Sequence, residues 1–198
     1  MLVGQTGPVS ARGVEMQFIL DAIDNAASGG HCFPAVVTAL TVPDIAGAVD
    51  FPGDKSANRY VSWVDQSFSP MFPQYGEHGV DGVALYALRC KLLHEGLSDP
   101  SKAPVSGKSK AASGKRLIAF NVGPGIFMHL CTAADGAGSS WTALRAETFC
   151  SDLTAAARRW LAAREGDGIA MRMLASLVDI RTDVPPLSQG VPMICAAV

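Results

Sequence analysis

The sequence predicts a mainly α-helical domain of five or six helices, with a small β-hairpin inserted before the penultimate helix. Two observations indicate this fold class. Apolar residues recur at helical spacing in most segments that lie between glycine- or proline-containing breaks. One segment, 79–96, is apolar around most of its circumference, which is typical of a helix buried among others. The 198 residues, 48% of them hydrophobic, are enough to form one well-packed core.

The first part of the chain predicts three helices ahead of this central one. An apolar stripe over 14–27 predicts the first helix, which a Ser-Gly-Gly break ends. A proline early in 34–40 loses no intrahelical hydrogen bond, so a second helix is expected there. Pro43 breaks or kinks it, and 44–49 can add another turn or two. A third helix is expected from Ser56, a suitable N-cap, to the next prolines.

The second part predicts the hairpin and two further helices. The apolar runs 116–122 and 126–132 flank a Gly-Pro-Gly turn, a pattern that favours a β-hairpin. A long helix is expected over 146–164 and a shorter one over 169–180, because apolar residues recur on one face of each. The segment 98–115 is rich in small residues and lysine. It is expected to be a mobile loop within the domain, either simply solvated or a flap over an anionic ligand.

These elements place a single domain over 14–180. Residues 1–13 are expected to form a flexible N-terminal extension, and 181–198 an extended tail. No apolar run approaches the roughly 18 residues of a membrane span, and the start lacks the features of a signal peptide. The five cysteines include no CxxC pair or close cluster, as expected of reduced thiols. We therefore expect a cytoplasmic protein with no membrane partner.

Three polar side chains, Arg89, Lys91 and His94, stand out on the apolar central helix. Charged side chains are costly to bury unpaired, so these residues are expected at an edge, an interface or a cleft. An arginine can stabilise charge on a phosphate while an imidazole moves a proton near neutral pH. Arg89 and His94 are therefore the candidate catalytic pair, and the chemistry that they suit is phosphodiester cleavage.

Other readings of these residues stay open. Five residues along a helix rotate by about 140°, so Arg89 and His94 meet only if the helix end bends. In the structural alternative, Arg89 pairs with a carboxylate such as Asp65 or Asp44, and His94 caps the last turn. The net charge of −2 excludes a global basic field, so any nucleic-acid contact must be local.

The helix order and several segments resemble the HEPN superfamily (higher-eukaryote and prokaryote nucleotide-binding domains). That family is an all-α fold with an arginine and a histidine four to six residues apart near the end of a core helix. Here that helix reads Ala-Leu-Arg89-Cys-Lys-Leu-Leu-His94-Glu-Gly, after three helices and before a hairpin and another long helix. More narrowly, the resemblance is to a group of uncharacterised bacterial proteins in that superfamily. It is carried by 39–44, Arg59-Tyr60 with Trp63, 86–96, and Phe149-Cys150 with Trp160.

The resemblance implies a homodimer that brings two Arg/His pairs together across a cleft and cuts RNA without a metal or other cofactor. Arg89 would hold the phosphate and His94 would act as general base or acid. Such an RNA-directed ribonuclease would belong to a toxin–antitoxin or phage-defence system. Nucleases of the family often carry Asn, Asp or His directly after the arginine, where this chain has Cys90. The alternative is a non-catalytic dimeric or regulatory module that binds a nucleotide, a nucleic acid or a cognate partner protein.

The remaining polar groups give weaker candidates. Lys91, Arg158 and Arg159 are the candidate substrate-binding residues, although both late-helix arginines also suit a solvated face. His129 and Cys131 fall on one face of the second hairpin strand, and His31-Cys32 could join them at zinc. Because no ligand pair of the usual close spacing is present, we predict no metal site.

Overall fold

The computed structural model describes residues 14–94, 115–123, 125, 128–134, 139–174, 179–181 and 193–195. The predicted N-terminal extension, 1–13, lies outside these residues. So do the predicted loop, 98–115, except for Lys115, and most of the predicted tail.

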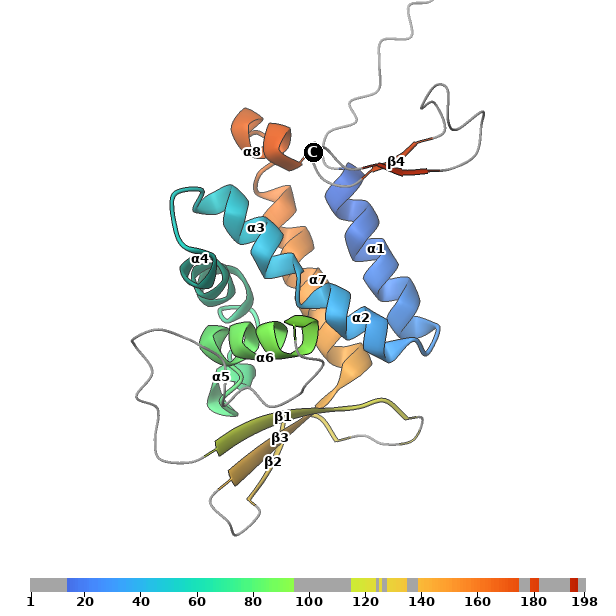
Figure 1. The fold of residues 1–198 in the computed structure, drawn as a ribbon, viewed down its shortest axis with the longest axis vertical. Helices are drawn as coiled ribbons and strands as arrows, with labels where there is room; N and C mark the ends of the chain where they lie inside the picture. Colours follow the sequence, from blue (N-terminus) through green and yellow to red (C-terminus); the bar gives the residue numbers. More distant parts are fainter. Residues whose placement is uncertain are drawn as a thin grey trace, which may run out of the picture.

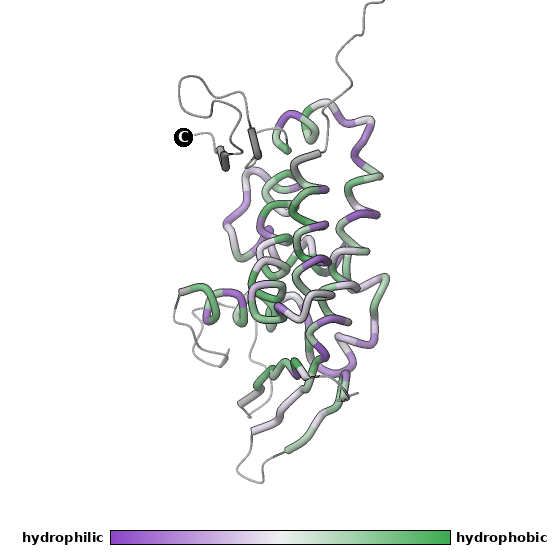
Figure 2. The backbone as a smooth tube through the Cα atoms, turned by 90° about the vertical axis from the view of Figure 1, so that its right-hand side faces the viewer, coloured by the Kyte–Doolittle hydropathy of each residue, from purple (hydrophilic) through white to green (hydrophobic). Residues whose placement is uncertain are grey.

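Helices make up most of the described chain, which confirms the mainly α-helical class (Figure 1). They are α1 (Val14–Ser28), α2 (Cys32–Ala39), α3 (Val42–Asp50), α4 (Ser56–Trp63), the π-helical turn η1 (Val64–Phe68), α5 (Gln74–Glu77), α6 (Gly82–His94), α7 (Ala146–Ala162) and α8 (Gly168–Leu174). Helix α7 packs against α1, α2 and η1. Hydrophilic and hydrophobic residues alternate along the helices, as expected where each buries one face (Figure 2).

Large aromatic side chains fill the centre of the bundle. Trp63 and Trp160 meet edge to face with their ring centroids 6.4 Å apart, joining α4 to α7. A second group surrounds Phe149, whose ring lies 6.5 Å from Phe68 and 5.3 Å from Phe120. Because Phe120 belongs to the sheet, this second group fastens the sheet to the helices.

The helix that begins at Ser56 changes from α-helical to π-helical geometry after Trp63. After Trp63 it continues through η1, where the amide of Ser69 donates to the carbonyl of Val64 at 2.8 Å. Such π-helical turns are rare and insert an extra residue into a helix. Helix α3 approaches α4 closely, because a Cβ added at Gly47 would lie 2.6 Å from the carbonyl oxygen of Arg59. Glycine at this position therefore sets the spacing between the two helices.

The predicted β-hairpin is wrong. Strand β1 (Lys115–Asn121) pairs in parallel with β3 (Ser139–Arg145), and β2 (Cys131–Ala134) pairs antiparallel with β3, giving the order β1-β3-β2. Strand β3 was not predicted, although Thr142 and Leu144 are buried on one face and Trp141 is exposed on the other. A parallel pair forms only after a long crossover, so local turn signals around 123–125 cannot reveal it. The sheet lies at one end of the bundle (Figure 1).

Two further differences concern shorter elements. Helix α5 was not predicted, and α8 ends at Leu174 instead of extending to residue 180. Residues that were assigned to the end of that helix and to the tail form β4 (Asp179–Arg181) and β5 (Met193–Cys195), which pair antiparallel. Pairing between distant strands has no local sequence signal, so the helix predicted over 169–180 included residues that belong to β4.

The apolar stretch that contains α2 and α3 is longer than we expected. Counted together as Cys32–Asp50, it has 19 residues and a mean hydropathy of 1.6, enough by length and composition alone to cross a membrane. The expectation that no apolar run approaches this length is therefore wrong. Half of the stretch is buried inside the protein, where it packs against α1, α4 and α7, as a core helix does.

Candidate functional site

Arg89 lies on α6 and forms an ion pair with a carboxylate of the same chain. Its Nε donates to Oδ2 of Asp44, at the start of α3, at 2.6 Å. About a fifth of each side chain is exposed, 21% for Arg89 and 20% for Asp44. The hydroxyl of Ser56, at the start of α4, donates to the other carboxylate oxygen at 3.5 Å. Asp44 thus joins three helices, and Asp44 is one of the two carboxylates that the sequence offered as a partner.

The charges of this pair are partly desolvated. Burial raises the pKa of the Asp44 carboxyl above its ordinary value, although Arg89 and Ser56 act in the opposite direction. Burial alone would lower the pKa of Arg89, but the attraction of Asp44 contributes to raising it. The guanidinium is therefore fully charged, and it pairs with a carboxylate whose charge would be unfavourable in this partly buried position without a partner.

Two tyrosines lie beside the ion pair. The ring of Tyr60 meets that of Tyr86 edge to face, with centroids 5.4 Å apart. Burial, followed by the charge of Asp44, raises the pKa of Tyr60 well above its ordinary value. Within the described part of the chain, the buried hydroxyl of Tyr60 has no hydrogen-bond partner. Asp44, Ser56, Tyr60, Tyr86 and Arg89 are called the Arg89 cluster below.

The predicted site residues do not all meet at this cluster. His94 is the last residue of α6, and its side chain lies outside the described part of the structure. Lys91 is buried, with 3% of its surface exposed, so its ammonium group is not displayed to solvent. Arg158 points to α1, where it pairs with Asp21 at 2.8 Å and Asp24 at 2.7 Å. Arg159 is exposed and lines a separate cavity.

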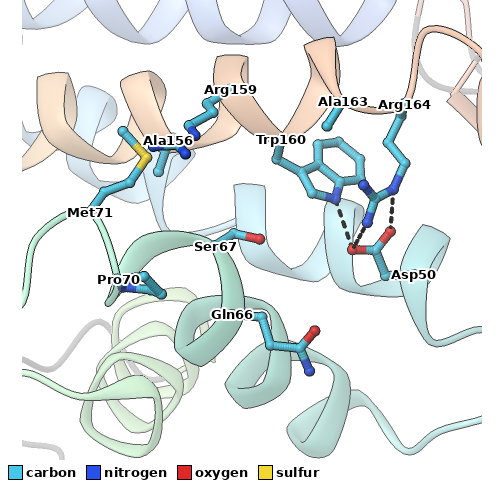
Figure 3. Close-up of a pocket in the computed structure, with 10 residues that line it drawn as sticks. All are labelled: Asp50, Gln66, Ser67, Pro70, Met71, Ala156, Arg159, Trp160, Ala163 and Arg164. Carbon is cyan, nitrogen blue, oxygen red and sulfur yellow. Dashed lines mark hydrogen bonds and ion pairs between the residues drawn. The ribbon is translucent and has the colours of Figure 1, made fainter.

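That cavity, between η1 and α7, was not expected from the sequence (Figure 3). It has a volume of about 340 Å³. At one end the carboxylate of Asp50 accepts a hydrogen bond from Trp160 Nε1 at 2.8 Å and two from Arg164 at 2.9 Å each. Asp50 is more than a hundred positions from Trp160 and Arg164, so no spacing pattern could have grouped the three residues. The nearest signal was the pair of arginines at 158 and 159.

His129 and Cys32, two of the candidate zinc ligands, contact other residues of the chain. His129 accepts a hydrogen bond at Nδ1 from the amide of Arg145 at 3.1 Å. Burial lowers the pKa of His129, which favours its neutral form. Cys32, by contrast, contacts the carboxylate of Glu147 at 3.8 Å. Among the described residues, no group of three or more His, Cys, Asp or Glu side chains could hold a metal ion.

No family model, curated protein or solved structure matches this chain. The resemblance to HEPN domains therefore stays a prediction, and function must be argued from the geometry described above.

Proposed function

We propose that this protein is a non-catalytic interaction module built on a HEPN-like bundle, in which Arg89 holds helices together and does not bind a scissile phosphate. The observation that carries this proposal is the 2.6 Å ion pair between Arg89 and Asp44. A phosphate that approached this nitrogen would have to displace the carboxylate of Asp44. The displaced carboxylate would then be left unpaired where burial already opposes its charge.

The surface that we propose for interaction is the outer edge of β2, which pairs with no further strand among the described residues. All four of its residues are exposed, and none is charged or proline. Exposed edge strands are usually guarded against pairing by charged residues or proline, and β2 has neither. Trp141 is 40% exposed and lies opposite Ala133, on the same face of the sheet. An open edge beside an exposed tryptophan is typical of a protein-binding surface.

The occupant that we propose for this edge is the β2 strand of a second copy. Two antiparallel edges can pair around a two-fold axis, because each strand then meets the same surface of its partner. This pairing would unite two three-stranded sheets into one continuous sheet. The proposed dimer thus forms at the sheet and leaves the Arg89 cluster inside each subunit.

Ala133→Lys is expected to convert the dimer to monomer, because a lysine ammonium on an edge strand opposes pairing. Ala133 is exposed, so the fold should tolerate the change. The measurement is molar mass by sedimentation velocity over a range of protein concentrations. Ala155→Lys, which places the same charge on the exposed face of α7, is the matched control and should remain dimeric. A monomeric wild type, or a dimer that is indifferent to Ala133→Lys, would count against the edge.

The wild-type protein and the variants Arg89→Met and His94→Ala are all expected to leave small structured RNAs uncleaved in the presence of EDTA. Cleavage products are followed on denaturing gels over hours. The opposite result, cleavage by the wild type and none by His94→Ala, would replace this proposal with its alternative. That alternative is a metal-independent endoribonuclease of a toxin–antitoxin or phage-defence system, with Arg89 released from Asp44 when RNA binds.

A further inference from the structure

The cavity between η1 and α7 combines a positive charge with apolar walls. Arg164 is held by Asp50 in two hydrogen bonds, and Asp50, with 12% of its side chain exposed, also receives the indole of Trp160. These contacts neutralise the charge of Arg164 and hold the carboxylate of Asp50 in place. Arg159 lines the same cavity and has no ion-pair partner in the part of the chain that the structure describes. The cavity therefore carries one uncompensated positive charge.

The walls around this charge suit an organic molecule better than a bare ion. Figure 3 shows Arg159 beside Ala156 and Met71, with Trp160 between Arg159 and Arg164. Gln66 and Ser67 line the opposite side with an amide and a hydroxyl. The volume of about 340 Å³ lies within the range of small-molecule sites, which start at about 300 Å³.

A second hollow lies next to the Asp50–Arg164 pair. This hollow of about 480 Å³ shares Asp50, Gln66 and Arg164 with the first. Its wall includes Ile169, which is 66% exposed and is one of the few large apolar side chains displayed to solvent in the described chain. An apolar group longer than the first cavity would therefore meet further apolar surface.

We propose that this cavity binds a small organic anion, a carboxylate or phosphate monoester attached to an apolar group. The guanidinium of Arg159 contacts the anion, since arginine pairs well with either oxyanion. Gln66 and Ser67 orient the ligand, and Met71 and Ala156 contact its apolar part. The inference goes beyond the proposed interaction module and does not depend on it, because none of these residues belongs to β2 or to the Arg89 cluster.

The chain supplies a matched control for this site. Arg158 is adjacent to Arg159 on α7 but faces α1, where it is paired with Asp21 and Asp24. Methionine at either position removes one positive charge and keeps much of the aliphatic length. Only the change at position 159 alters the cavity.

The test is an NMR titration of the full chain, with the indole N–H of Trp160 as the reporter. This N–H group donates a hydrogen bond to Asp50, and both residues line the cavity. Trp141 lies on the sheet and provides an internal reference. The probes are phenyl phosphate and 3-phenylpropionate, which share an aromatic group but carry different oxyanions. Inorganic phosphate lacks the apolar group, and benzyl alcohol lacks the charge.

The expected result is a saturable shift of the Trp160 resonance with at least one aromatic anion, and the tighter probe identifies the oxyanion. Binding should weaken at least tenfold in Arg159→Met and stay within twofold in Arg158→Met. The proposal is overturned if neither aromatic anion binds at millimolar concentration, or if Arg159→Met binds equally well. It is also overturned if benzyl alcohol binds as tightly, or if inorganic phosphate does, which would indicate an adventitious ion only.

Discussion

Phe149→Ala is expected to lower the free energy of unfolding by about 3–5 kcal/mol, the range for removing a fully buried phenylalanine from a core. Phe149 has no exposed surface and lies where α7, η1, α5 and the sheet meet. Its ring contacts those of Phe68, Tyr75 and Phe120, so the cavity left by alanine would be lined by rigid rings that cannot easily collapse into it. Because these contacts join the sheet to the bundle, the loss should affect both.

The measurement is urea denaturation followed by circular dichroism, with stability taken from the midpoint and slope. Phe33→Ala is the matched control, since Phe33 is 66% exposed on α2 and its loss should change stability by less than about 0.5 kcal/mol. If both variants unfold at the same urea concentration, the aromatic group around Phe149 does not hold the sheet to the helices.

Local patterns predicted the helices well because burial of one face leaves a periodic trace in the sequence. The bounds of α1, α3 and α7 agree with prediction to within a few residues. The sheet was missed because its central strand, β3, gains its partners from segments before it in the chain, one of them through a parallel pairing. Trp141 is exposed and Thr142 is buried, which reverses the usual placement of apolar and polar residues on a strand, so the sequence carried no alternation that matched the burial. A strand that leads directly into a long helix also has no turn signal to mark its end.

Site residues were harder to predict than helices. The sequence offered Asp44 and Asp65 as partners of Arg89. Helix α4 packs against both α3 and α6, and this arrangement brings Asp44 on α3 to the arginine on α6. Asp65 lies instead near the start of α6, where a Cβ at Gly82 would meet its carboxylate at 3.1 Å. The adjacent arginines 158 and 159 looked equivalent in sequence, but the helix turns them toward α1 and toward the η1 cavity respectively. Adjacent positions on a helix differ by about 100° in direction, which is enough to give them different neighbours.

Arg89→Met is expected to lower the free energy of unfolding by about 2–3 kcal/mol at neutral pH. Breaking a fully buried ion pair from one side costs about 3–5 kcal/mol, and the partial exposure of this pair should reduce that loss. The cost arises because Asp44 remains ionised and loses its partner. Adding Asp44→Asn to this variant removes the unpaired charge. The double variant should therefore lose at least about 1 kcal/mol less stability than the sum of the losses in the two single variants.

The same pair predicts how the loss depends on pH. Burial raises the pKa of Asp44 in the folded state, and removing Arg89 should raise it further. Folded Arg89→Met then binds a proton more tightly than the unfolded chain, so its stability relative to wild type should recover as the pH falls toward the ordinary aspartate pKa of about 3.9. Urea midpoints for wild type, both single variants and the double variant at pH 7 and near pH 4 measure this. Additive losses with no pH dependence would mean that Asp44 does not hold Arg89 in solution. The arginine would then be available to a phosphate, and the case for a non-catalytic module would fail even if no cleavage had been detected.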